Sequence, residues 1–179
     1  MQCILSGILF LEQHLKTIQL TPEVYRPECC PSCGKDGIWR HGNYSRKPDR
    51  FSSGAESLNP IPILRFRCSN CGKTCSVLPE CLPPRFWYLW CIQQRALIEL
   101  LMGKSLREIN QTHRPSRSTC RRWWLRLKDR FLIQRDALCA QISSLREHVT
   151  FDAFWKSCFS QLTLSAAMLI CHQSDVIIS

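Results

Sequence analysis

The sequence predicts an α+β protein, in which a small β-hairpin domain is followed by an all-α domain. Two Cys-x-x-Cys-Gly motifs bracket a pair of strand-like segments in the first half of the chain. Segments with helical spacing of apolar residues and clear helix caps follow in the second half. A chain of 179 residues, 45% of them hydrophobic, is long enough to bury a core in one compact domain or in two small ones.

The two cysteine motifs predict a metal site. Cys30-Pro-Ser-Cys33-Gly and Cys68-Ser-Asn-Cys71-Gly are separated by 34 residues. Each motif points two sulfurs at one ion, while its glycine takes the open backbone conformation that the turn needs. Four thiolates complete a closed tetrahedral shell, so we expect one structural Zn2+ per chain, held by Cys30, Cys33, Cys68 and Cys71. The alternative is two unrelated pairs of buried or disulfide-bonded cysteines.

The residues between the motifs predict a β-hairpin. Residues 38–44 and 61–67 are typical of short strands, and residues 47–60 are rich in Ser, Gly, Pro and charge, as a solvated loop is. The second strand alternates between two faces, with Leu64, Phe66 and Cys68 on one and Ile63, Arg65 and Arg67 on the other. A hairpin that carries two such cysteine turns is a zinc ribbon. Leu82-Pro83-Pro84 ends it, because two prolines cannot continue a ladder.

Two helices are expected next. Apolar residues fall at helical spacing from Phe86 to Met102, and Gly103 is a suitable left-handed stop. Ser105-Leu-Arg-Glu108 is a capping box, in which the Ser hydroxyl and the Glu carboxylate each accept from the other residue's backbone amide. It opens a short helix that reaches about Thr112.

A third helix is expected from Arg117 to about Phe131, with Ser116 as its N-cap. Its apolar stripe consists of Cys120, Trp123, Trp124, Leu127 and Phe131, and the opposite face carries Ser118, Arg121, Arg122 and Leu125. The adjacent tryptophans could instead stack on bases, but the stripe favours core packing. A short capped helix, a turn at residues 113–115 and a helix with a basic outer face form a helix-turn-helix, whose second helix enters the DNA major groove.

Charge and cysteine usage restrict the partners and the compartment. Ten basic and two acidic residues lie between Lys104 and Arg135, so this segment carries +8 of the formal net charge of +10. Such local charge predicts a nucleic-acid partner. The other nine cysteines are scattered singly, as free thiols of a reducing cytosol are. The apolar stretch 4–11 lacks the flanks of a signal peptide, and 162–171 is too short to span a bilayer, so we expect no membrane segment.

The order of these motifs resembles the N-terminal half of bacterial insertion-sequence transposases and their small companion proteins. The resemblance covers residues 28–131 and rests on these stretches: Cys30-Pro-Ser-Cys33-Gly, His41-Gly-Asn-Tyr44, Arg67-Cys-Ser-Asn-Cys71-Gly-Lys-Thr74, Leu101-Met-Gly-Lys-Ser-Leu-Arg-Glu-Ile109 and Ser118-Thr-Cys-Arg-Arg-Trp123. In that family a zinc ribbon precedes a helix-turn-helix that binds terminal inverted repeats. The resemblance implies zinc on the four cysteines and DNA contacts from the second helix of the motif. A phenylalanine is frequent where Cys75 stands, which implies an apolar role for Cys75.

The catalytic part of such transposases has no counterpart here. An RNase H-like domain needs three carboxylates that hold two metal ions, but only 48 residues follow Phe131. Residues 149–152 could form a strand ending in a catalytic Asp152, although a solvated or capping Asp is the default. Instead, an apolar face of Phe154, Trp155, Cys158, Phe159 and Leu162 predicts a helical tail that packs on the motif or on a second copy.

The sequence therefore predicts a zinc-containing, sequence-specific double-stranded-DNA-binding protein of a bacterial mobile element, cytoplasmic and nucleoid-associated when bound, with no catalytic activity of its own. Its expected parts are a leader (1–27), the zinc ribbon (28–82), the helix-turn-helix (85–135) and the helical tail (136–179). The expected DNA-binding residues are Lys104, Arg107, Arg114, Arg117, Ser118, Arg121, Arg122, Arg126 and Lys128. Two alternatives remain: a truncated transposase or nuclease fragment that uses Asp152, and a zinc-ribbon adaptor that docks a separate transposase.

Overall fold

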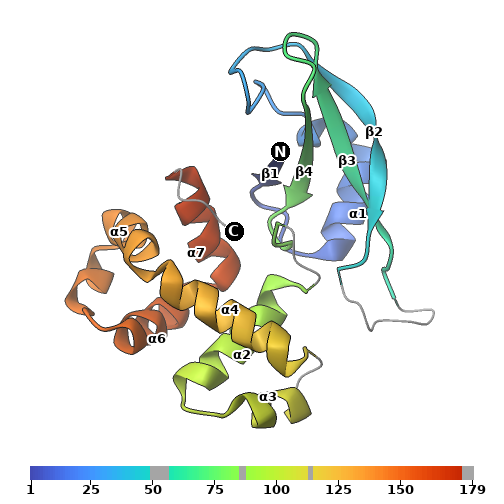
Figure 1. The fold of residues 1–179 in the computed structure, drawn as a ribbon. Helices are drawn as coiled ribbons and strands as arrows, with labels where there is room; N and C mark the ends of the chain where they lie inside the picture. Colours follow the sequence, from blue (N-terminus) through green and yellow to red (C-terminus); the bar gives the residue numbers. More distant parts are fainter. Residues whose placement is uncertain (49–56, 85–87, 113–114, 175–179) are drawn as a thin grey trace. The chain divides into compact units, whose positions relative to one another are not determined.

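The structure, a computed structural model, describes residues 1–48, 57–84, 88–112 and 115–174. Within these residues the chain is a mixed α+β protein with a four-stranded sheet and seven α-helices (Figure 1). It divides into two compact units, Met1–Leu89 and Trp90–Ser179. The α+β class is as predicted, with the sheet confined to the first unit and helices alone in the second.

The first unit contains four strands, one α-helix and one short 3-10 helix. They are β1 (Gln2–Leu5), α1 (Leu11–Leu20), η1 (Pro22–Tyr25), β2 (Ile38–Arg46), β3 (Ile61–Cys68) and β4 (Thr74–Pro79). The sheet order is β1-β4-β3-β2. β2 pairs with β3 in the antiparallel sense, as predicted, and Ile38 lies opposite Cys68. Much of the loop predicted at 47–60 falls outside the described residues.

Two strands of the sheet were not expected from the sequence. β4 pairs antiparallel with β3, and β1, from the segment interpreted as a leader, pairs parallel with β4 in the register Gln2↔Ser76. β4 is internal to the sheet, so Cys75 to Pro79 are all buried. β4 has only six residues, and its buried Ser76 stands between Cys75 and Val77, so it shows neither a continuous apolar run nor a sustained alternation.

Alternate residues of β3 supply two different clusters of the core. Leu64 and Phe66 join a cluster with Tyr25 and Val77, whereas Ile63 joins a second cluster against which α1 packs. Ile63 was expected on an outward face, but it is completely buried. The reason is that Leu11 and Leu15 of α1 cover this end of the face.

A buried histidine ties α1 to the sheet. His14 is completely buried; its Nδ1 is bonded to the Tyr25 hydroxyl, and its Nε2 lies 2.9 Å from the Pro62 carbonyl oxygen. A carbonyl can only accept, so Nε2 carries the proton and Nδ1 accepts from Tyr25. Burial lowers the pKa of His14 below its ordinary value of 6.5. The ring is therefore held neutral.

Six α-helices make up the part of the second unit that the structure describes. They are α2 (Trp90–Leu101), α3 (Leu106–Thr112), α4 (Arg117–Asp129), α5 (Phe131–Gln141), α6 (Phe151–Gln161) and α7 (Leu164–Gln173), with the 3-10 helix η2 (Ser143–Glu147) between α5 and α6. The predicted helix at 86–102 is present as α2, and its expected first residue, Phe86, lies outside the described residues.

The predicted helix caps are confirmed. Gly103 follows α2 with φ +85°. Before α3, the Ser105 amide donates to Glu108 Oε2 at 2.7 Å, and the Glu108 amide donates to Ser105 Oγ at 3.3 Å. Ser116 caps α4 by accepting from the Thr119 amide at 3.3 Å. These local hydrogen bonds fix where α3 and α4 begin.

The apolar stripe of α4 packs inward as predicted. Cys120, Trp123 and Leu127 are buried, and Trp124 packs edge-to-face on Phe151 of α6 at a centroid distance of 5.2 Å. The predicted end of this helix was wrong: α4 stops at Asp129, and Phe131 begins α5. Neither Gly nor Pro marks the break, so the sequence carried no signal for it.

The C-terminal helices complete the core of the second unit. Phe154, Trp155 and Cys158 of α6 are completely buried, which confirms the apolar face predicted for this segment. The strand considered at 149–152 is absent, because Asp152 lies exposed in the first turn of α6. A carboxylate at this position complements the partial positive charge of the helix N-terminus. None of the described helices is long and apolar enough to cross a membrane.

The neutral His14 leads to a prediction about pH. In zinc-saturated protein, the free energy of unfolding should fall between pH 7.5 and 5.5, because the unfolded chain protonates His14 near pH 6.5 while the folded chain resists it. The neutral His14 ring contributes to the free energy of unfolding above pH 6.5. As the pH falls below 6.5, this contribution is lost, and the free energy of unfolding decreases by at most about 1.4 kcal/mol per pH unit.

Urea titrations at the two pH values measure this effect. His14→Gln should show a smaller loss of stability on acidification than the wild type, whereas His41→Gln, which removes an exposed histidine of the same unit, should not. Equal losses in the wild type and His14→Gln would contradict the neutral ring.

Candidate metal centre and basic groove

Two turns with the same backbone geometry present the four cysteines. The Gly34 amide donates to the Cys30 carbonyl oxygen at 2.8 Å, and the Gly72 amide donates to the Cys68 carbonyl oxygen at 3.0 Å. Both glycines adopt left-handed backbone, with φ +70° and +69°. A Cβ at Gly34 would meet nothing within 4 Å, so the conformation, and not crowding, requires glycine.

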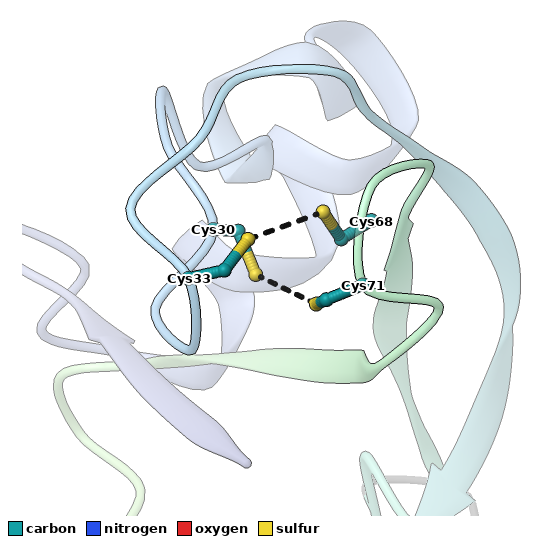
Figure 2. A group of neighbouring side chains, drawn as sticks. All are labelled: Cys30, Cys33, Cys68 and Cys71. Carbon is teal, nitrogen blue, oxygen red and sulfur yellow. Dashed lines mark hydrogen bonds between the residues drawn. The ribbon is translucent and has the colours of Figure 1, made fainter.

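The turns bring four sulfur atoms together. The Sγ atoms of Cys30, Cys33, Cys68 and Cys71 all lie within 4.8 Å of one another. Figure 2 marks two of these sulfur–sulfur contacts, Cys30 to Cys71 and Cys33 to Cys68, each 3.7 Å. Four thiolates around one ion at about 2.3 Å lie about 3.8 Å apart in a regular tetrahedron. The cluster therefore has the donors and the spacing to hold one metal ion, and the four thiols form no disulfide.

The thiols of the cluster differ in acidity. The Cys71 amide donates to the Cys68 sulfur and lowers the pKa of that thiol to about 6, and the Ser32 amide, 3.4 Å from the Cys30 sulfur, lowers the pKa of Cys30. The Lys35 amide favours the Cys33 thiolate, but desolvation and hydrogen bonds to neighbouring thiols raise the Cys33 pKa to about 11. Four thiolates at this spacing need a cation to neutralise them.

Hydrogen bonds between the two turns stabilise the cluster. The amide and the hydroxyl of Ser69 both donate to the Gly37 carbonyl oxygen, at 3.0 and 2.9 Å, and Asn70 Nδ2 donates to the Asp36 carbonyl oxygen at 2.9 Å. A Cβ on Gly37 would stand 2.5 Å from Ser69 Oγ, so the close approach of the turns requires glycine here. Gly37 carries no local sequence signal, because its partner Ser69 is more than thirty residues away.

Two further cysteines and a histidine in the first unit lie outside the cluster. Cys29 and His41 are exposed, and the His41 ring packs edge-on against Trp39. Cys75 is buried in the apolar cluster of Phe66 and Val77, which fits the apolar role expected for it.

In the second unit, the exposed sides of α3 and α4 form an open groove of about 970 Å3. Its lining residues are Ser105, Leu106, Arg107, Arg117, Ser118, Arg121, Arg122 and Leu125. Five of the predicted DNA-binding residues, including four arginines, thus share one concave surface, which we call the basic groove. No acidic side chain is among these described lining residues.

The walls of the basic groove are held by contacts behind it. The Arg117 amide at the start of α4 donates to Asn110 Oδ1 of α3 at 3.1 Å. Beneath α4, the buried Cys120 and Trp123 anchor the opposite face of the helix in the core. The arginines therefore project from a supported scaffold. Asn110 carries no sequence signal, because its role depends on the packing of two helices.

Three other predicted DNA-binding residues, Lys104, Arg126 and Lys128, are not among the groove-lining residues that the structure describes. Lys104 pairs with Glu99 at 3.3 Å, and Arg126 is exposed further along α4. Lys128 Nζ stands over the rings of Trp124 and Phe151, 5.0 and 5.7 Å from their centroids, so a cation–π contact holds it. Arg114 lies outside the described residues.

The fold and the site define an α+β protein with a four-cysteine cluster in a sheet unit and a basic groove in a helical unit. Residues 30–123, more than half of the chain, match the family model described as "Domain of unknown function (DUF6431)", and the chain belongs to this family. The matched range begins at Cys30, contains all four cysteines, and ends within α4 after Arg122. No curated protein and no solved structure matches the chain.

The cluster geometry predicts one metal ion per chain, and the zinc expected from the sequence provides the test. Cys33→Ser or Cys71→Ser should abolish stoichiometric zinc, measured by atomic absorption on purified protein, because three thiolates leave the shell open. The matched control, Cys29→Ser combined with Cys75→Ala, should keep one zinc, since neither thiol belongs to the cluster. Stoichiometric zinc in Cys71→Ser would contradict this ligand set.

Proposed function

We propose that this protein binds double-stranded DNA in a sequence-specific way, contains one structural zinc, and belongs to a bacterial mobile element. In this proposal β2 and β3 with their cysteine turns are a zinc ribbon, and α3 and α4 are a helix-turn-helix that binds terminal inverted repeats. The protein acts in the cytoplasm on DNA, with a separate transposase or a second copy of itself as its protein partner.

The observation that carries the proposal is the basic groove. Four arginine side chains from α3 and α4 line it, and α4 is anchored by its apolar stripe, so its basic face is free to dock. The major groove of B-DNA is about 12 Å wide and admits one α-helix. α2, α3 and α4 pack on one another, as the helices of a helix-turn-helix domain do.

The positions along α4 suggest a division of roles. Ser118, Arg121 and Arg122 lie in the first two turns of the exposed face, where a recognition helix reaches base edges. Arg107 and Arg117 at the groove walls are placed to bind phosphate, and phosphate contacts set the register of the protein on DNA. Lys104, Arg114 and Arg126 extend the positive field, while Lys128 contributes less because its ammonium group stands over two aromatic rings.

Zinc fits the cluster on chemical grounds. Four thiolates form a soft, tetrahedral donor set, which zinc occupies in structural sites. All four positions are filled by protein sulfur, so a bound ion has no place for a substrate or a water. We therefore assign the metal the role of joining the two turns of the ribbon.

The nuclease alternative depends on Asp152, and no specific observation favours it. Asp152 is exposed at the start of α6, and the four-cysteine cluster is the only group of potential metal ligands found among the described residues. The adaptor alternative predicts DNA binding that is weak and insensitive to salt. The experiments below distinguish it from the proposal.

Arg121 and Arg122 provide the first test. Arg121→Ala or Arg122→Ala should weaken binding to a selected DNA site by about 1–3 kcal/mol and relax the preference at one base pair, if that arginine bonds a guanine through both its acceptors. Fluorescence anisotropy on the selected and a scrambled duplex measures both effects. Lys156→Ala, which removes an exposed charge on α6, is the matched control and should bind like the wild type.

Arg107 provides the second test. Arg107→Ala should weaken binding to all sequences alike and reduce the slope of log affinity against log salt by about one, because one phosphate contact is lost. The measurement is the same titration repeated over several salt concentrations. Wild-type affinity that does not change with salt would overturn the proposed function and favour the adaptor.

A further inference from the structure

A leucine stands in the middle of the basic groove. Leu125 of α4 lines the groove with Arg121 and Arg122, and 51% of its surface is exposed. Successive residues of a helix are about 100° apart, which places Leu125 about 40° from Arg121 and about 60° from Arg122, between the two. The leucine therefore lies on the face that the proposed function directs at DNA, about one helical turn beyond Arg121.

Leu125 does not belong to the core of its own chain. It lies about 160° around the helix from Leu127, which is buried in the apolar stripe. A large apolar side chain between two arginines contributes neither to packing of the core nor to solubility. Lys or Glu at this position would stabilise the helix about equally well. A partner that covers the groove would remove the exposed part of the side chain from water, which favours binding if the partner offers an apolar group there.

We propose that Leu125 contacts the 5-methyl group of a thymine, so that the bound site requires thymine at the base pair that this residue faces. The inference rests on the proposed function, since it assumes that α4 lies in the major groove. Among the four base pairs, only those with thymine present a methyl group in that groove. Leucine has no hydrogen-bonding group, so it cannot read the donors and acceptors that Arg121 and Arg122 are able to read.

The chemistry of the surrounding groove favours this occupant. An apolar protein segment that covered Leu125 would also bury Arg121 and Arg122 without anionic partners, at a large desolvation cost. A DNA major groove offers phosphates and guanine acceptors to the arginines and a methyl group to the leucine within one binding event. Leu106 on α3, partly buried at the edge of the same groove, extends the apolar part of the lining.

The test begins with selection of a binding site by the full-length protein from a pool of random-sequence DNA duplexes. The selected sequence is then made as a 20-base-pair duplex, in which each thymine in turn is replaced by deoxyuridine. This substitution removes the 5-methyl group and keeps every hydrogen-bonding group. We expect one replacement to weaken wild-type binding about three- to fivefold, which corresponds to the loss of one buried methyl group.

Three variants assign that effect to its residue. In Leu125→Ala, the thymine and deoxyuridine duplexes should bind equally. In Arg121→Ala, affinity should fall on both duplexes while their ratio stays as in the wild type. Leu132→Ala is the matched control, because Leu132 is 67% exposed on α5 outside the groove lining, and it should keep both the affinity and the ratio.

The outcomes separate this inference from the proposed function. If a site is selected but no deoxyuridine replacement weakens wild-type binding, or if Leu125→Ala keeps the wild-type ratio, the thymine contact is wrong and the DNA-binding function stands. If the pool yields no preferred sequence, the proposed function fails, and the inference fails with it. The wild-type measurement can overturn the thymine contact without any variant, and Leu125→Gln, which keeps a long side chain at this half-exposed position, assigns the effect if Leu125→Ala does not fold.

Discussion

The register of β2 against β3 is the constraint on which the metal centre depends. Ile38 lies directly opposite Cys68, and the two cysteine turns extend from these strand ends, so pairing of the strands brings the four sulfurs together. A slip of one residue would turn Cys68 to the other face of the sheet and exchange the apolar residues of β3 between the two faces. Core packing and metal ligation thus select the same register.

The helical unit has its own organising feature, the contrast between the two faces of α4. Cys120, Trp123 and Leu127 hold one face in the core, and the Phe151 ring of α6 packs against Trp124 on the side of the helix. Because the C-terminal helices complete that core, they support the helix that carries the groove arginines. A rigid support of this kind holds side chains in a defined arrangement before a ligand arrives, which lowers the entropic cost of binding.

Local signals account for what the sequence predicted. Ser105, Glu108 and Ser116 act on residues within one helical turn, and the stripe of α4 repeats over consecutive turns, so both could be interpreted without tertiary information. The two cysteine turns were equally local. Their proximity was predicted because metal chemistry, unlike packing, specifies how many ligands must meet.

Contacts between distant segments account for what the sequence could not predict. The parallel partner of β1 follows it by more than seventy residues, and the place of Gly37 depends on Ser69 in the opposite turn. The end of α4 at Asp129 has no breaker residue, and the packing of Phe131 on Phe151 and Phe154 just after it joins segments twenty or more residues apart. The helical spacing correctly predicted that the solvent-facing arginines of α4 share one face. It could not predict the groove that they line, because the groove depends on where α3 packs.

The pairing of β1 with β4 has a consequence for synthesis on the ribosome. Gln2 faces Ser76 in the sheet, so β1 leaves the ribosome well before its only described neighbour strand exists. At about 5–20 residues per second, the interval is several seconds. During this interval the apolar β1 and the first cysteine pair have no partners. The unit can complete its sheet and its four-cysteine cluster only when β4 and the second cysteine pair have emerged.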